Sequence, residues 1–165
     1  MAVSIKEVAL RTIELEAQSV SGLASFINSD FEKAVQAIAA AKGRVVVSGI
    51  GKSAVIAQKI VATFNSTGTP SIFMHAADAI HGDLGMIQQE DVVIIISKSG
   101  ESPEIKVLVP LIRNFGNILI GMVGSTKSYL AKNSTIILNT TVEQETCPNN
   151  LAPTSSTTAQ LAMGD

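Results

Sequence analysis

The sequence contains no tryptophan, and only 4% of its 165 residues are aromatic. Its formal net charge is −2 at pH 7, and its 12 lysines and arginines form no basic block. Proteins that bind nucleic acid usually depend on clustered cations that contact phosphates and on aromatic side chains that stack on bases. The composition therefore argues against a nucleic-acid partner.

Cysteine occurs once, at Cys147, so no disulfide can form within the chain. A chain without internal disulfides is typical of a reducing compartment, and we expect a cytoplasmic protein. No apolar run approaches the ~20 residues of a membrane-spanning helix. The first twenty residues include Lys6, Arg11 and Glu14, which is unlike the apolar segment of a secretory signal. We therefore expect no membrane partner.

Apolar residues are plentiful: they make up 46% of the chain, and the mean hydropathy is +0.35. This composition fits a sheet that is covered by helices on both faces, so that whole strands are buried. Apolar spacing predicts helices over 5–27 and 29–42, the second beginning with a capping box at Ser29 and ending before Gly43 at its C′ position. The length suits a single domain over 1–165.

After the helical residues 5–42, a core over 44–165 alternates short β-branched runs with helical segments. Strands are predicted over 45–47, 70–74, 91–96, 117–122 and 135–138, and helices over 53–64, 103–115, 127–132 and from Pro153 onward. Alternation of this kind predicts a parallel sheet with right-handed crossovers and helices on both faces, a three-layer α/β/α sandwich. Because ligands bind beyond the carboxyl ends of such strands, we expect the functional loops after Val47, Ile96 and Leu138.

Two of the predicted strands run into loops of similar composition. The segments VVVSGIGKS (45–53) and VVIIISKSGES (92–102) both pass from an apolar strand into serine, glycine and lysine ahead of a helix. If the two strands are neighbours in the sheet, their loops could hold one ligand from two sides.

Three types of ligand fit the first loop to different degrees. A Walker A motif would need its first glycine at Val46, inside the strand. Residues 49–54 match the dinucleotide pattern G-x-G-x-x-A, but the acid expected about twenty residues later, at the end of the next strand, is missing. A small phosphorylated ligand needs only free amides at a helix N-terminus, the charge of Lys52, and hydroxyls such as those of the second loop. Serines also cap helices, yet three serines within 97–102 exceed the need of one cap.

Six segments together resemble the sugar isomerase (SIS) domain, and more narrowly its arabinose-5-phosphate isomerase branch. They are SGIGKS (48–53), STGTPS (66–71), HGDLGM (81–86), SKSGES (97–102), ETCP (145–148) and LAPTSSTTA (151–159). The resemblance implies a five-stranded sheet of flavodoxin-like order and a homotetramer whose sites combine residues of several subunits. It also implies interconversion of D-ribulose 5-phosphate and D-arabinose 5-phosphate through an enediol(ate). That reaction feeds the synthesis of 3-deoxy-D-manno-octulosonate and lipopolysaccharide.

The resemblance also implies the site residues. The residues that match catalytic positions are Glu145, Lys52, Glu104 and His81. Those that match substrate- or phosphate-binding positions are Ser48, Gly49, Ser53, Ser97, Ser99, Gly100, Ser102, Thr154, Ser155 and Ser156. Moving a proton between adjacent carbons requires a base, charge that stabilises the enediolate and a grip on the phosphate, but no cofactor and no metal.

Several alternatives stay open at this point. Glu145 could be a solvated loop acid, Glu104 could serve the helix dipole, and Lys52 could contact either the enediolate or the phosphate. Most members of the family continue with a longer last helix, a histidine-bearing tail and a pair of CBS domains, so the last helix here looks truncated. Position 98 is lysine where asparagine or glutamine is common. A sugar-phosphate sensor without catalysis and an isomerase of another sugar phosphate are the alternative functions.

Overall fold

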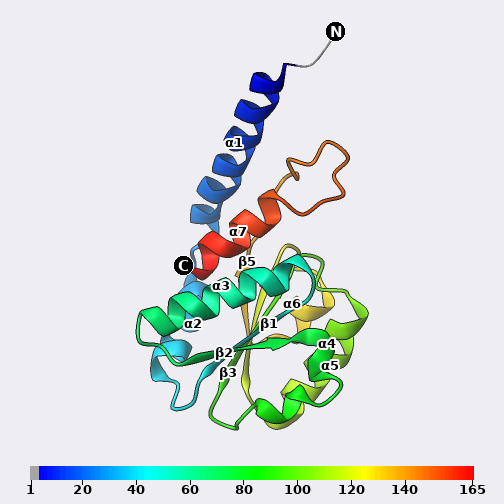
Figure 1. Ribbon diagram of the computed structural model, residues 1–165. Coiled ribbons are helices and arrows are strands. Elements are labelled where there is room, and N and C mark those ends of the chain that lie inside the picture. Colours follow the sequence, from blue (N-terminus) through cyan, green and yellow to red (C-terminus); the bar gives the residue numbers. More distant parts are fainter. Residues whose placement is uncertain (1–3) are drawn as a thin grey trace.

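Five parallel strands form the centre of the structure, a computed structural model that describes residues 4–165 (Figure 1). The strands are β1 (Val45–Gly49), β2 (Ser71–His75), β3 (Val92–Ser97), β4 (Ile118–Val123) and β5 (Ile136–Asn139). Their order is β2-β1-β3-β4-β5, and every pair is parallel. The predicted flavodoxin-like sheet is thus confirmed, and the strand order reverses between β1 and β3, where such folds bind ligands.

Helices cover both faces of this sheet. They are α1 (Ile5–Gly22), η1 (Leu23–Phe26), α2 (Ser29–Ala40), α3 (Lys52–Ser66), α4 (Ala76–Ala79), η2 (Asp83–Met86), α5 (Pro103–Phe115), α6 (Tyr129–Asn133) and α7 (Ser155–Gly164). Buried side chains of α2, α3 and α7 pack on one face, and those of α4, α5 and α6 on the other. The predicted α/β/α layering is therefore confirmed. Among residues 4–165, no helix combines the length and apolar character needed to cross a bilayer.

The strands are stable because both of their faces are apolar. Along β1, Val45 and Val47 face the α2–α3–α7 layer, whereas Val46 faces α4 and α5. All residues of β1 and β3 are buried. Each buried valine or isoleucine contributes roughly 1.5–3 kcal/mol, so the short β-branched runs suffice to define the core.

An ion pair and its hydrogen bonds fasten the opposite, amino edge of the sheet. The Arg44 guanidinium lies 3.1 Å from Asp91 Oδ2, and the backbone N–H groups of Arg44 and Gln88 also donate to this carboxylate. Burial raises the pKa of Asp91, but these hydrogen bonds and the Arg44 charge outweigh it and hold the pKa below its usual range. Asn117 donates to the Asp91 carbonyl at 2.8 Å. We call Arg44, Asp91 and Asn117 the amino-edge clasp.

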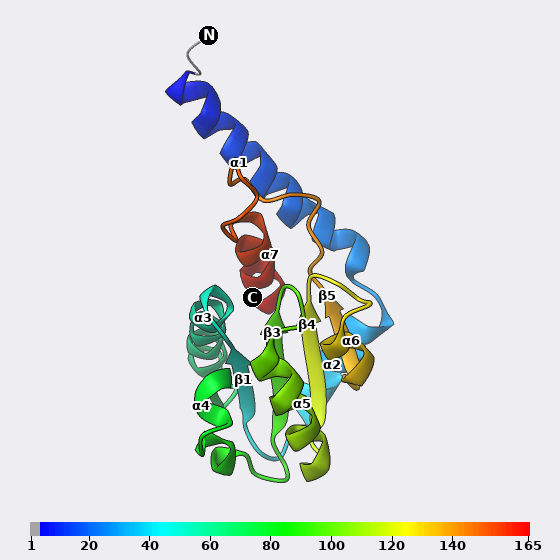
Figure 2. The ribbon, with the colours of Figure 1, turned by 90° about the vertical axis from the view of Figure 1, so that its right-hand side faces the viewer.

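Helix α1 lies outside the two layers. No residue of α1 is buried, and the helix extends away from the sheet alongside α7 (Figure 1; Figure 2). Its apolar side chains remain exposed: Ile5 is 89% accessible and Ile13 is 66% accessible. A hydroxyl–carboxylate contact from Thr158 to Glu16 joins α7 to α1.

One predicted helix cap and two predicted helix boundaries were wrong. Asn28, not Ser29, caps α2, since its Oδ1 accepts hydrogen bonds from two backbone N–H groups in the first turn. Gly43 does not terminate that helix, which ends at Ala40; a Cβ at Gly43 would lie 2.5 Å from Asp91 Oδ1, so glycine is needed for close approach. Pro153 precedes the last helix, which begins at Ser155 with Thr154 at the N-cap.

Candidate active site at the carboxyl edge of the sheet

The first loop at the switch point is very short. β1 ends at Gly49, and α3 begins at Lys52 after only two residues. A Cβ on Gly49 would lie 2.9 Å from the backbone carbonyl of Ser53, so only glycine lets the helix start this close to the strand. Gly51, with a φ of +58°, occupies the N-cap position, and no side chain between residues 4 and 165 caps this helix. The first amides of α3 are therefore open to an anion.

The second loop, residues 97–102, follows the neighbouring strand β3, and we call it the serine loop. The Ser97 hydroxyl accepts a hydrogen bond from the Gly100 amide at 3.0 Å, which closes the turn. Two contacts brace the loop against α6: the Leu130 amide donates to the Gly100 carbonyl at 3.0 Å, and the Tyr129 amide donates to the Glu101 carboxylate at 2.6 Å. Pairing of β1 with β3 places both loops side by side, which confirms that they follow neighbouring strands.

Ser102 holds the N-cap position of α5, yet its hydroxyl caps nothing. Its Oγ is buried and has no hydrogen-bond partner among residues 4–165. The hydroxyls of Ser48 and Ser155 also have no hydrogen-bond partner within residues 4–165, and both residues are 0% exposed. A buried hydroxyl without a partner costs about 1–3 kcal/mol, so each of these groups needs a partner from outside the protein, such as a water molecule or a bound ligand. The alternative that the second loop's serines only cap a helix therefore fails for Ser102.

Ser102→Ala is expected to weaken binding of inorganic phosphate by about tenfold or more, because a hydrogen bond to an anion contributes ~1.5–3 kcal/mol. The free energy of unfolding should change by less than about 1 kcal/mol, since the hydroxyl has no protein partner to lose. Calorimetric titration and urea unfolding measure the two quantities. Ser134→Ala is the control: it removes a hydroxyl that donates to the Leu130 carbonyl, and should leave phosphate affinity unchanged. Equal phosphate affinity in wild type and Ser102→Ala would contradict the assignment.

Glu145 reaches this edge from the long segment between β5 and α7, which lies beside α7 where α1 projects (Figure 1). Its side chain is only 1% exposed. Oε2 accepts from the amide of Thr154 at 2.7 Å, from its hydroxyl at 3.1 Å, and from the Ser156 amide at 3.1 Å. Oε1 accepts from the Ser156 hydroxyl and from the Lys98 ammonium, each at 2.5 Å. Glu145 is therefore not a solvated loop acid: it caps α7 and pairs with the serine loop.

These contacts control the ionisation of Glu145. Burial raises its pKa, but the hydrogen bonds from Lys98, Ser156 and Thr154 outweigh burial and lower the pKa to about 2. Each donor favours the charged carboxylate. In this state Glu145 is a fully ionised and fully hydrogen-bonded group.

The other residues implied by the resemblance fall into two groups. Ser53 and Ser156 are committed to protein partners, because the Ser53 hydroxyl donates to Gln160 at 3.1 Å and that of Ser156 to Glu145. Lys52 is exposed and forms no ion pair with any residue between 4 and 165. The side chains of half-buried Glu104 and exposed His81 likewise make no hydrogen bond within that range. Within this range, the Ser99 hydroxyl accepts a single hydrogen bond, from the backbone amide of Glu101 at 3.2 Å.

Sequence reasoning missed two polar residues at this edge. From the sequence, Lys98 is noted only as an additional positive charge in the second loop. In the structure it forms an ion pair with Glu145, which is 47 positions away in the chain. Gln160 is 1% exposed and holds the first turn of α3 through Ser53. No local pattern signals either contact, because helical periodicity marks Gln160 only as one position on α7.

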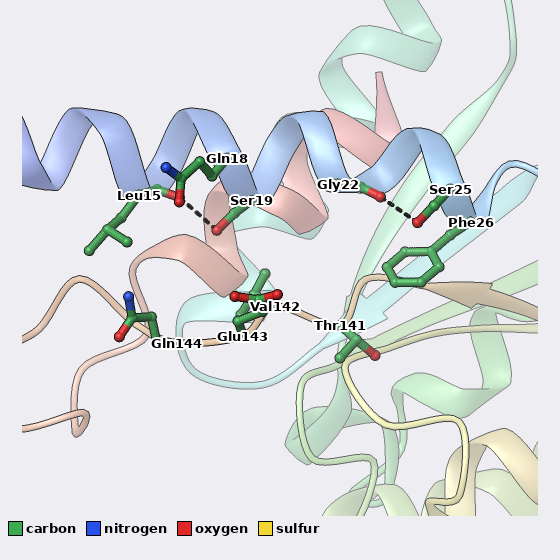
Figure 3. A pocket seen from close by; sticks show the side chains of 10 residues that line it. All are labelled: Leu15, Gln18, Ser19, Gly22, Ser25, Phe26, Thr141, Val142, Glu143 and Gln144. Atoms are coloured by element: carbon green, nitrogen blue, oxygen red, sulfur yellow. Dashed lines mark hydrogen bonds between the residues drawn. The ribbon is translucent and has the colours of Figure 1, made fainter.

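Two cavities lie on the other side of the Glu145 segment, beneath α1. The first, of about 400 Å³, separates Leu15 and Gln18 of α1 from residues 142–144 (Figure 3). The second, of about 590 Å³, is bounded by Arg11, Cys147 and Glu145 among others. Neither is lined by the two loops at the switch point, so the candidate active site is the open carboxyl edge itself.

The fold and these loops define a doubly wound α/β protein that presents, within residues 4–165, two helix N-termini without side-chain caps at its switch point. The chain belongs to the SIS domain family, whose sequence model matches residues 37–165. Its match begins inside α2, and it includes the whole sheet and both loops at the switch point.

Known relatives agree with this membership. The arabinose 5-phosphate isomerase KdsD of Pseudomonas aeruginosa is 53% identical over 157 residues, which are 95% of this chain and 48% of that protein. The protein of the same name in Francisella tularensis is 48% identical over 160 residues, 95% of this chain and 49% of that one. The chain thus spans about half the length of the curated relatives it matches. A protein of Escherichia coli CFT073, solved in complex with arabinose 5-phosphate, superposes with a TM-score of 0.92 at 37% identity, covering 99% of this chain and 88% of that one.

Proposed function

We propose that the chain is the isomerase domain of an enzyme that interconverts D-ribulose 5-phosphate and D-arabinose 5-phosphate. The single observation that carries the proposal is the pair of uncapped helix N-termini, with the orphaned hydroxyl of Ser102, at the β1–β3 switch point. Amides and hydroxyls in this arrangement suit a phosphate monoester. The identities to arabinose 5-phosphate isomerases, and the sugar-phosphate complex of a structural relative, support this choice of sugar. The product would feed synthesis of 3-deoxy-D-manno-octulosonate and lipopolysaccharide.

The geometry supports a division of labour at the site. The serine loop would hold the phosphate through the hydroxyls of Ser99 and Ser102, fixing the distance to the reacting carbons, while the Gly100 amide closes the turn by donating to Ser97. Glu145 would act as the base that moves the proton between C1 and C2. The exposed ammonium of Lys52, at the N-terminus of α3, would stabilise the enediolate oxygen or the phosphate. His81 and Glu104 would assist proton transfer to the sugar oxygens.

We also propose a cytoplasmic homotetramer with sites shared between subunits. The exposed apolar side chains of α1 support association, because an exposed apolar patch often marks a protein–protein interface. The His81 side chain is exposed and makes no hydrogen bond within residues 4–165, so it is available to complete the site of another subunit.

Glu145→Gln is expected to reduce turnover by about 10³-fold, since amide nitrogen and oxygen cannot accept the carbon-bound proton. The assay mixes the protein with ribulose 5-phosphate in deuterated water and follows deuterium at C2 of arabinose 5-phosphate. Glu143→Gln, an exposed change in the same segment, is the matched control and should retain wild-type turnover. An active Glu145→Gln variant would contradict the assignment of the base, and absence of aldose with the wild type would contradict the isomerase.

A sugar-phosphate sensor is the second candidate, and the state of Glu145 favours it. A carboxylate with five hydrogen-bond contacts and a pKa of about 2 is a poor base as it stands. A sensor would show thermal stabilisation by arabinose 5-phosphate without turnover, whereas an isomerase shows both.

A further inference from the structure

The Lys98–Glu145 ion pair joins the two parts of the site that must act together. Lys98 lies in the serine loop between Ser97 and Ser99, and Glu145 lies in the segment before α7. The Lys98 side chain is 45% exposed, whereas that of Glu145 is 1% exposed. The Lys98 backbone is held by a hydrogen bond from the Gly124 amide at 3.1 Å. The ammonium is thus the mobile member of the pair, on a fixed backbone.

We propose that Lys98 is a positioning residue that couples phosphate occupancy of the serine loop to the state of Glu145. With the loop empty, the ammonium pairs with the Glu145 carboxylate. A phosphate monoester seated on the serine loop draws the ammonium to itself and releases that carboxylate from its ion pair. This inference rests on the proposed function, because it concerns the same phosphate and the same base.

The charge of a phosphate and the length of the Lys98 side chain support this transfer of the ammonium from Glu145 to the phosphate. The ammonium stands on a flexible four-carbon stem, and its own residue lies between two serines of the loop, so a ligand there is within its reach. A phosphate dianion carries twice the charge of a carboxylate. The remaining donors to Glu145 come from Thr154, the N-cap residue of α7, and from Ser156 in its first turn, and they stay in place. The carboxylate therefore keeps its position while it loses a cation.

Transfer of the Lys98 ammonium to the phosphate would make Glu145 a stronger base. Within residues 4–165, Lys98 is the charged side chain that donates a hydrogen bond to Glu145. Arg11 of α1 and Cys147 line the cavity that Glu145 also lines, but neither forms a hydrogen bond with the Glu145 carboxylate. Removing the ammonium raises the pKa of Glu145 toward its ordinary value, since an adjacent cation favours the charged form. The base would thus be strengthened only when a phosphorylated ligand is bound.

A double-mutant cycle on phosphate binding tests the coupling without turnover. Inorganic phosphate is titrated calorimetrically into the full chain, into Glu145→Gln and Lys98→Gln, and into the double variant. Glu145→Gln frees the ammonium, so we expect phosphate affinity to rise about fivefold, the equivalent of ~1 kcal/mol for a half-exposed ion pair. In the Lys98→Gln background the same change should alter affinity by less than about twofold. Lys33→Gln, which removes an exposed lysine of α2, serves as the charge control and should leave affinity unchanged.

An effect of Glu145→Gln that is equal in both backgrounds would overturn the coupling, because it would reflect only the loss of a negative charge. Crystals of the wild-type chain with inorganic phosphate give a second test if a variant fails to fold. The expected result is Lys98 Nζ on the phosphate and more than about 4 Å from Glu145. Bound phosphate with the ion pair intact would overturn this inference alone. No bound phosphate would overturn the phosphate-binding assignment as well.

Kinetic measurements on Lys98 variants distinguish the proposed coupling from a role in which Lys98 only holds Glu145 in place. Lys98→Gln should raise KM for ribulose 5-phosphate by about fivefold while kcat stays near the wild-type value, and Lys98→Arg should restore KM. A fall in kcat with unchanged KM would mean that Lys98 only holds Glu145 in place, and would overturn the coupling.

Discussion

Gly100→Ala is expected to lower the free energy of unfolding by about 3 kcal/mol and to abolish phosphate binding. Gly100 has a φ of +64°, a conformation that costs a residue with a side chain ~1–2 kcal/mol. Its Cβ would also lie 2.7 Å from the Ser128 Cβ and closer still to the hydroxyl. Relief of this overlap must displace Ser128, whose hydroxyl caps α6. The serine loop would move with it.

Gly116→Ala separates the two contributions. Gly116 has a φ of +80° at the end of α5, but apart from its chain neighbours no residue between 4 and 165 lies within 4 Å of the position of its Cβ. The control should therefore lose only the conformational part, about 1 kcal/mol, and bind phosphate normally. Urea unfolding and calorimetry give both quantities. Equal losses of stability in the two variants would show that the contact between Gly100 and Ser128 carries no energy.

Acid is expected to destabilise the protein strongly through Glu145. Its pKa is about 2 in the folded protein and about 4.5 in a free side chain. Because the folded pKa is the lower one, the stabilisation is complete above about pH 4.5 and is lost as the pH falls toward 2. A shift of this size corresponds to roughly 3 kcal/mol, of which about 2 kcal/mol should be lost by pH 3.

Urea unfolding at pH 6 and pH 3 measures this loss. Wild type should lose about 2 kcal/mol more than Glu145→Gln, whose side chain does not titrate. Glu143→Gln has the same change in charge on an exposed side chain and should follow the wild type. The same acid sensitivity in wild type and Glu145→Gln would show that other carboxylates, such as Asp91, dominate.

Much of the fold could be predicted because its signals are local and repeated. Short β-branched runs such as 92–96 strongly favour strands. Helix α5 begins and ends at its predicted residues, 103 and 115. The errors fell where two residue types compete for one role, as Asn28 and Ser29 do at the N-cap of α2. The local pattern assigns Gly43 to helix termination, but a contact distant in the chain requires the glycine.

The site could be predicted only in part. Glycines and serines after two strands indicate an anion site, and the sheet indeed places β1 beside β3. Tertiary contacts decide which serines remain available. The Ser102 hydroxyl has no partner within residues 4–165, whereas the hydroxyls of Ser53 and Ser156 donate hydrogen bonds to side chains distant in the chain. The same holds for Lys98, whose partner is set by the path of the segment before α7.

The amino-edge clasp has a consequence for how this architecture can diversify. Arg44, Asp91 and Asn117 tie β1, β3 and β4 at the ends opposite the loops, so the determinants of strand register are separate from those of recognition. Loop positions at the far ends that do not pack against the sheet or its helices can change while the sheet stays in register. A change of ligand preference would then require few substitutions and would leave the register of the strands intact.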